Sequence, residues 1–247
     1  MFDHFSLPTI LVSYVALLFS LCVHEAAHAT SAYWLEDDTA ARLGRMTLNP
    51  LAHMDPIGTF LFPILGMTTG LPFIGWAKPV PIQPNRFTRR FSMRTGISIV
   101  SAAGPLSNLV LSLIFLVVTS LSVRFMAEGG PQKAKLFMEA LQGPEALMAA
   151  GMSTVSVLML SLSGQLIIIN VMLAIFNLLP VGPLDGAGVL QGFLPRRWAE
   201  FFDRYRQYMY IVLLVLVFTK LLWYILDPIL NVVFSVLLFL ASFILGV

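Results

Sequence analysis

Long apolar runs constrain the fold of this chain more than any other feature of its sequence. Four runs carry few charged residues or none: residues 7–32, 97–123, 150–179 and 209–247. A membrane span needs about 20 mostly apolar residues, so each run is long enough to cross a bilayer. Only 11% of the 247 residues are charged, whereas a soluble domain has about a quarter. The sequence therefore predicts an all-α membrane protein that crosses the lipid bilayer several times.

These runs divide into about five predicted transmembrane helices. Three form an expected core, at about residues 7–33, 97–123 and 153–179, and two follow at about 209–225 and 228–245. Residues 56–84 are apolar as well, but prolines and glycines interrupt them repeatedly. Broken backbone at membrane depth must lie against protein or a water-filled cavity. We therefore predict a re-entrant or β-hairpin-like segment there, with extended strand at residues 73–82.

Two regions follow from this division of the chain. Residues 1–206 are the expected core, and residues 207–247 are an expected C-terminal transmembrane hairpin that turns at Asp227 and Pro228. The first apolar run is not expected to be a cleaved signal peptide, because residues 1–6 contain Asp3 and no Lys or Arg. A signal peptide begins with a positively charged region.

Charge and cysteine content exclude several classes of function. A net charge of +2 without a basic, aromatic-rich face argues against nucleic acid as a partner. The single cysteine, Cys22, excludes an intrachain disulfide and a cysteine-based metal site. The predicted loops on one side of the membrane carry 11 Lys and Arg residues, against 3 on the other. The positively charged loops follow the first and third spans, and cytoplasmic loops carry an excess of Lys and Arg. The first span therefore ends in the cytoplasm, so the N-terminus is expected outside, in a multi-pass protein of the cell membrane.

A HExxH motif lies near the cytoplasmic end of the first span, at residues 24–28. His24 and His28 are one helical turn apart, so both imidazoles lie on one helix face and can bind one zinc ion. Glu25 is placed to take a proton from a water on that zinc. Ionisable side chains inside a membrane are costly, and they indicate a functional site by default.

Zinc in a catalytic site needs a third protein ligand and keeps a fourth position open for water. The other spans and their edges offer only Asp185, Lys220 and Asp227 as ionisable candidates. Asp185 follows the turn-forming Pro180 and Pro183 at the end of the third span, on the same side of the membrane as His24. A turn or helix-cap aspartate is the plainer interpretation of Asp185, but beside a HExxH motif we favour a metal ligand.

With these motifs the chain resembles the site-2 proteases, a family of zinc-dependent intramembrane metalloproteases. The resemblance rests on HExxH, on Gly104-Pro-Leu-Ser-Asn108 in the second span, and on Asn177, Pro180 and Asp185-Gly186 at the end of the third. It implies a three-helix catalytic core with Asp185 as the third zinc ligand. It also implies that Asn108 lies near the active site, where it holds substrate or the oxyanion. Many members carry a PDZ or regulatory domain, and this chain resembles a minimal member without either.

The predicted function is zinc-dependent hydrolysis of peptide bonds in the transmembrane segments of other proteins, with the active site toward the cytoplasm. Two alternatives stay open: a metal or proton transporter, and an inactive homologue that binds membrane partners. No substrate-binding residue is assigned, although an exposed strand edge at residues 73–82 would let a substrate bind as an added strand. His53 is more simply a structural loop residue than a zinc ligand.

Overall fold

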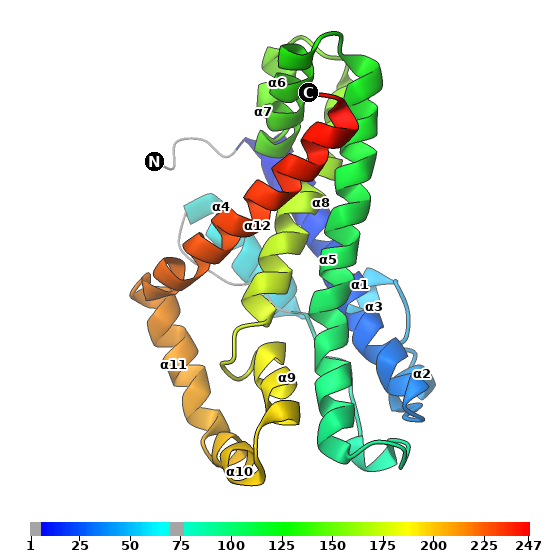
Figure 1. The fold of residues 1–247 in the computed structure, drawn as a ribbon, viewed down its shortest axis with the longest axis vertical. Coiled ribbons are helices and arrows are strands. Elements are labelled where there is room, and N and C mark those ends of the chain that lie inside the picture. Colours follow the sequence, from blue (N-terminus) through cyan, green and yellow to red (C-terminus); the bar gives the residue numbers. More distant parts are fainter. Residues whose placement is uncertain (1–5, 70–76) are drawn as a thin grey trace.

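The computed structural model describes residues 6–69 and 77–247. These residues form an elongated bundle of helices, and no strand occurs among them (Figure 1). The all-α prediction is therefore confirmed for the described part of the chain.

Four described helices are long and apolar enough to cross a membrane, which makes this a multi-pass membrane protein. They are α1 (Leu7–Trp34), α5 (Met93–Met126), α8 (Thr154–Asn177) and α12 (Leu221–Leu245). Serine caps three of these helices at the N-terminus: Ser6, Ser92 and Ser153 each accept a hydrogen bond from a backbone N–H three residues later. Such caps satisfy amide groups that the helix leaves without a partner.

Helices α1, α5 and α8 pack against one another and form the core of the bundle. Polar side chains join them, because Ser20, Asn108 and Asn170 are fully buried and hydrogen-bonded to one another across the three helices. In a membrane, close packing and interhelical hydrogen bonds hold helices together, since lipid tails are as apolar as leucine. The predicted three-helix core thus has the composition that such packing needs.

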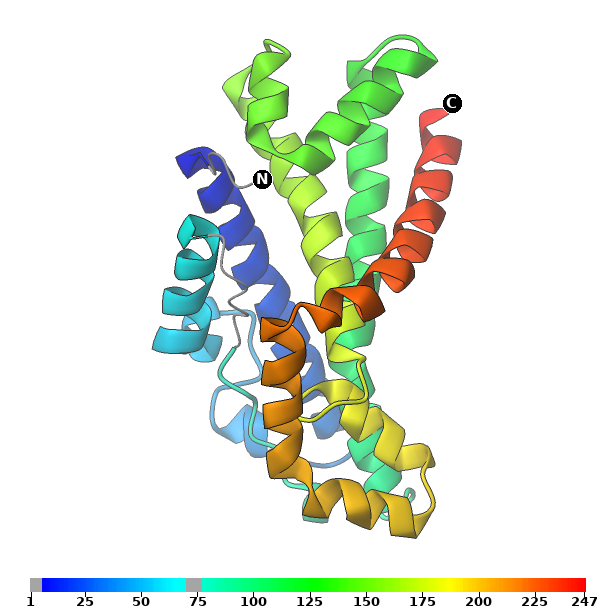
Figure 2. The same ribbon diagram turned by 90° about the vertical axis from the view of Figure 1, so that its left-hand side faces the viewer.

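Short elements connect α1 to α5 (Figure 2). They are α2 (Thr39–Arg42), α3 (Pro50–His53), a π-helical turn (Pro56–Leu61) that continues into α4 (Phe62–Thr69), and a 3-10 turn (Pro84–Arg86). The π-helical turn lies beside α1, where the rings of Phe60 and Tyr14 meet edge to face.

The structure describes only part of the strand predicted at residues 73–82. Residues 73–76 lie outside the described residues, and residues 77–82 have no regular secondary structure. Pro79 and Pro81 lack the N–H groups that a strand ladder needs. The β-hairpin expectation is therefore not supported in the described half of the segment, while the re-entrant path stays a prediction.

The two ends of the bundle carry different elements. At the end where the chain terminates lie α6 (Gly130–Gln142) and α7 (Pro144–Ala149). At the opposite end lie α2, α9 (Asp185–Phe193) and α10 (Arg196–Arg204) (Figure 1). Helix α9 packs against α5, which places the segment after α8 against the core.

The C-terminal region differs from the expected pair of antiparallel spans. Helix α11 (Arg206–Phe218) has 13 residues, about 20 Å, which is shorter than the hydrocarbon core. The chain bends at Lys220, which has a left-handed backbone, and α12 then runs through Pro228, where the sequence predicted the turn. Both helices lead away from α10 toward the end where the chain terminates, so they do not fold back as a hairpin (Figures 1 and 2). A proline inside a membrane helix is tolerated when neighbouring groups satisfy the freed carbonyl.

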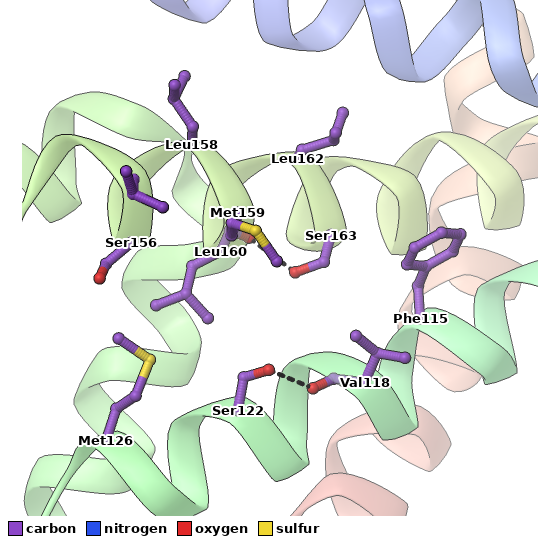
Figure 3. Close-up of a pocket in the computed structure, with 11 residues that line it drawn as sticks. Phe115, Val118, Ser122, Met126, Ser156, Leu158, Met159, Leu160, Leu162 and Ser163 are labelled. Carbon is purple, nitrogen blue, oxygen red and sulfur yellow. Dashed lines mark hydrogen bonds between the residues drawn. The ribbon is translucent and has the colours of Figure 1, made fainter.

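An apolar groove of about 530 Å³ runs between α5 and α8 (Figure 3). Its lining is mostly aliphatic and methionine side chains, with the hydroxyls of Ser122 and Ser163 bonded to carbonyls of their own helices. None of the predicted site residues lines it. The groove is therefore separate from the site described next.

Candidate metal centre

His24 and His28 form one half of the site, and both belong to α1. Their rings are nearly perpendicular, with centroids 4.6 Å apart, and their Nε2 atoms are 3.0 Å apart. Both side chains are buried inside the bundle. The spacing of four residues puts them on one helix face, as the sequence predicts.

Asp185 forms the other half, at the first position of α9. Its Oδ2 atom lies 3.1 Å from Nε2 of His24 and 3.3 Å from Nε2 of His28. One ligand atom from each of the three residues lies within 4.8 Å of the other two. The structure thus brings the three predicted ligands together.

Glycines allow Asp185 to reach this place. A Cβ atom on Gly186 would collide with the carbonyl oxygens of Leu178 and Leu179, so the turn closes tightly only with glycine there. On α9, Gly188 and Gly192 pack directly on α5: a Cβ on Gly188 would lie 2.9 Å from Cβ of Ser101, and one on Gly192 would lie 2.6 Å from Oγ of Ser98. Small residues four apart let two helices approach closely.

Gly104 of α5 leaves room for the ligand atoms of the two histidines. A Cβ atom there would collide with Nε2 of His28 and would lie 2.7 Å from Nε2 of His24. Any other residue at this position would fill the place where the ligand atoms converge. The Gly-Pro motif noted in the sequence therefore has a direct steric role at the site.

The hydrogen bonds behind the two rings show which nitrogen carries the proton. Nδ1 of His28 lies 2.7 Å from the carbonyl oxygen of Val100, and Nδ1 of His24 lies 2.6 Å from Oδ1 of Asn108. These oxygens only accept, so in each ring Nδ1 is the donor and Nε2 of the neutral ring keeps its lone pair. Both lone pairs then face each other and the carboxylate of Asp185.

This convergence of acceptors fits a bound cation. Oδ2 of Asp185 is buried and has no hydrogen-bond partner in the described part of the chain. A buried carboxylate oxygen without a donor is energetically costly, and a cation bound at this point would offset that cost. Two imidazole nitrogens and one carboxylate oxygen are the ligand set of a catalytic zinc site with an open fourth position.

Glu25 lies beside the centre and is nearly buried. Its Oε2 atom accepts a hydrogen bond of 2.9 Å from the backbone N–H of Val80, and no partner of Oε1 occurs in the described residues. The segment of Val80 is held to the rest of the fold on both sides, since Lys78 donates to the carbonyl of His53 and Gln83 donates to Asp37. One carboxylate oxygen of Glu25 is thus fixed by the backbone of this segment.

Two further predicted residues have other surroundings. His53 is the last residue of α3 and is buried, with Nε2 2.8 Å from the carbonyl oxygen of Thr47, and it does not belong to the metal cluster. Asn108 is fully buried, and its amide binds His24 on one side and Asn170 on the other. These contacts favour a role in supporting His24 over contact with a substrate.

Sequence reasoning missed four residues that shape this site: Ser20, Gly104, Val80 and Asn170. The sequence could have indicated Asn170, because an amide in the middle of an apolar span needs a buried hydrogen-bond partner. Gly104 lay within a recognised motif, but its steric role depends on the approach of α1. No sequence pattern indicates that the N–H of Val80 meets Glu25, since 55 positions separate the two residues.

The family comparison agrees with this geometry. A family model described as peptidase family M50 matches residues 91–220, more than half of the chain. The matched region contains Gly104, Asn108 and Asp185, and the HExxH motif lies before it.

Curated relatives are similar over most of the chain. The Bacillus subtilis (strain 168) protein "Putative zinc metalloprotease YwhC" is 36% identical over 219 residues, which cover 88% of this chain and 84% of that protein. "Putative zinc metalloprotease Rip2" of Mycolicibacterium smegmatis is 29% identical over 206 residues, covering 83% of this chain and 66% of the relative. No solved structure matches the chain significantly. The family model and the Bacillus relative together show that this chain belongs to peptidase family M50, the site-2 protease family of membrane zinc metalloproteases.

Proposed function

We propose that this protein is a zinc-dependent endopeptidase that cuts peptide bonds within transmembrane segments of other membrane proteins. One observation carries the proposal: His24, His28 and Asp185 converge within 4.8 Å at the core of a bundle of membrane-crossing helices. Membership of a zinc metalloprotease family supports the same reaction class. A site so enclosed by spanning helices is suited to a substrate that arrives through the membrane.

The chemistry divides between the metal and Glu25. A zinc ion held by His24, His28 and Asp185 would polarise the scissile carbonyl and activate a water molecule for attack. Glu25 would accept a proton from that water through its Oε1 atom and pass it to the leaving nitrogen. The hydrogen bond from Val80 holds the other carboxylate oxygen and so orients the base.

The active site is proposed to face the cytoplasmic side of the cell membrane. The end of the bundle that carries α2, α9 and α10 also carries the segments that are rich in Lys and Arg, which is the side that stays in the cytoplasm. The N-terminus of α1 then lies outside. A membrane-impermeant thiol reagent would test this in intact cells: a cysteine introduced at Gln132 should react, and one introduced at Arg89 should not.

The binding of a substrate as an added strand gains little support from residues 77–83. Pro79 and Pro81 have no N–H group, and the N–H groups of Lys78, Val80 and Gln83 already have partners. Few backbone donors therefore remain for a substrate in this part of the chain. A substrate would have to bind at another segment or break these hydrogen bonds.

The proposal is tested with purified protein in sealed liposomes that contain a single-span test substrate. The expected result is cleavage at a bond inside the hydrocarbon region, mapped by mass spectrometry of the products, with the same peptide left uncut when it is fused to a soluble carrier. Zinc movement across the membrane without any cleavage would instead support a transporter. Cleavage of only the soluble form would reject an intramembrane site.

A further inference from the structure

A network of buried polar side chains lies behind the metal centre and joins the three core helices. Ser20 comes from α1, Asn108 from α5 and Asn170 from α8, and each is fully buried. They connect to His24 through Asn108, whose Oδ1 lies 2.6 Å from Nδ1 of the ring. We call these three residues the amide network. Such a set is costly in a membrane unless each donor finds an acceptor.

The orientation of Asn170 is fixed by groups that can act in only one way. Its Nδ2 atom lies 2.7 Å from the carbonyl oxygen of Leu166, which only accepts. The same Nδ2 lies 2.8 Å from Oγ of Ser20, whose own proton goes to the carbonyl of Ala16 at 2.7 Å. The amide of Asn170 must therefore present its nitrogen to Ser20 and Leu166 and its oxygen to Asn108.

This orientation passes to Asn108 and then to His24. Because Oδ1 of Asn170 faces Asn108 at 2.6 Å, Asn108 must donate through Nδ2. The second proton on that nitrogen points to the carbonyl of Ser20 at 3.4 Å. Oδ1 of Asn108 is thus left facing His24, where it can only accept the proton of Nδ1. The Nε2 lone pair of His24 is then directed to the metal centre.

The two histidines differ in what fixes them. His28 donates to the backbone carbonyl of Val100, which no side-chain substitution removes. His24 depends on side chains from two other helices. Partners behind a metal-binding histidine fix its tautomer and ring orientation, and their loss typically costs about 10–100-fold in metal affinity.

We propose that Asn170 and Ser20 are positioning residues of the metal centre, which act through Asn108 to hold His24 in the tautomer with its proton on Nδ1. The assignment rests on the proposed function in one respect, namely that His24 binds the metal. Neither residue touches the ligand atoms. Their effect on zinc comes only through the direction of one hydrogen-bond network.

The test measures the tautomer directly in the metal-free protein. The chain has four histidines, so ¹⁵N labelling of histidine gives few enough signals to assign His24 by a His24→Gln reference. In wild type, the expected signals are a protonated Nδ1 and an unprotonated Nε2. Asn170→Leu should produce a mixture of tautomers and weaken zinc binding about 10–100-fold in chelator competition.

Two variants separate positioning from general packing. Asn170→Asp keeps an oxygen facing Asn108, so it should retain the wild-type tautomer and more of the zinc affinity than Asn170→Leu. Ser20→Ala should weaken zinc binding less than Asn170→Leu does, because the carbonyl of Leu166 still orients the amide of Asn170. Its matched control is Ser161→Ala, another fully buried serine that bonds the carbonyl four residues back, at Val157, but lies outside the network.

The outcomes distinguish this inference from the proposed function. If wild type shows the proton on Nε2 of His24, or if Asn170→Leu folds and matches Ser161→Ala in both tautomer and zinc affinity, the positioning role is wrong. Failure of wild type to bind zinc would reject the proposed function, while the tautomer measurement would still decide the role of the network. A tautomer change in Asn170→Leu but not in Asn170→Asp supports the inference even if Asn170→Leu is less stable.

Discussion

The two halves of the metal centre reach the same point by different routes. His24 and His28 lie one turn apart on α1, so helix geometry alone places them together. Asp185 arrives after a turn, and its place depends on the packing of α9 on α5 through Gly188 and Gly192. The first half is thus a local property of one helix, whereas the second is a property of the tertiary fold. Changes in packing should therefore damage the second half and leave the first intact.

The strongest expected effect comes from the glycine that lies against both histidines of the first half. Gly104→Ala places a methyl group where the ligand atoms of His24 and His28 converge, and we expect zinc binding to be lost. Zinc content of the purified protein measures this directly. Gly130→Ala is the control, because its methyl would meet only the side chain of Val247. A zinc content equal to wild type in Gly104→Ala would mean that the ligands do not meet in front of this glycine.

A smaller effect should separate the halves. Gly188→Leu forces α9 away from Ser101 and should displace Asp185, which weakens zinc binding by about 10–100-fold, as for a lost supporting contact. In the metal-free protein, Nδ1 of His24 should stay bonded to Asn108 and Nδ1 of His28 to Val100, as in wild type. Phe193→Leu, on the exposed side of α9, is the matched control. Equal disturbance of both histidines would show that the halves are not independent.

A third effect concerns the base and not the metal. Val80→Pro removes the N–H that binds Glu25, so kcat should fall while zinc content remains unchanged. The decrease should stay below the roughly 10²–10⁴-fold that a general base contributes, because Glu25 itself is present. Val80→Ala keeps the N–H and is expected to behave as wild type. Loss of activity in both variants alike would point to packing of the valine side chain.

The smallest expected effect comes from Asp38, which belongs to neither half of the metal centre. Its substitution gives a reference for a change that should not affect zinc. The hydrogen bond from Arg42 holds the pKa of Asp38 below its ordinary value, and Arg86 adds to this at 2.9 Å. Because the folded pKa is lowered, the stabilisation is complete above the ordinary pKa and is lost as the pH falls through the lowered value. Thermal unfolding should show a slight decrease in Tm at acid pH that Asp38→Asn lacks. Zinc binding at neutral pH should be the same in both proteins.

The sequence predicted the parts of this protein that follow from local patterns. Apolar runs located α1, α5 and α8 to within a few residues, and the HExxH spacing located His24 and His28 on one helix face. Zinc as the cofactor and the protease family also followed from motifs. These features need only helix periodicity and the length of a membrane span.

The rest depends on tertiary contacts that periodicity does not encode. Asp227 and Pro228 were predicted to separate two spans, yet α12 continues through both residues and the chain bends at Lys220 instead. The family resemblance implied that Asn108 lies near the active site and holds substrate or the oxyanion. Its burial against Asn170 became visible only once α5 and α8 were packed together. The contact of Val80 with Glu25 has the same origin, since a loop must return to α1 to make it.

Zinc content and cleavage, measured together on wild type and Glu25→Gln, test the central claim most directly. The structure predicts about one zinc ion in each protein, since His24, His28 and Asp185 are unchanged. It predicts cleavage of a transmembrane substrate by wild type only. Absence of zinc from wild type, or equal cleavage by Glu25→Gln, would contradict the account.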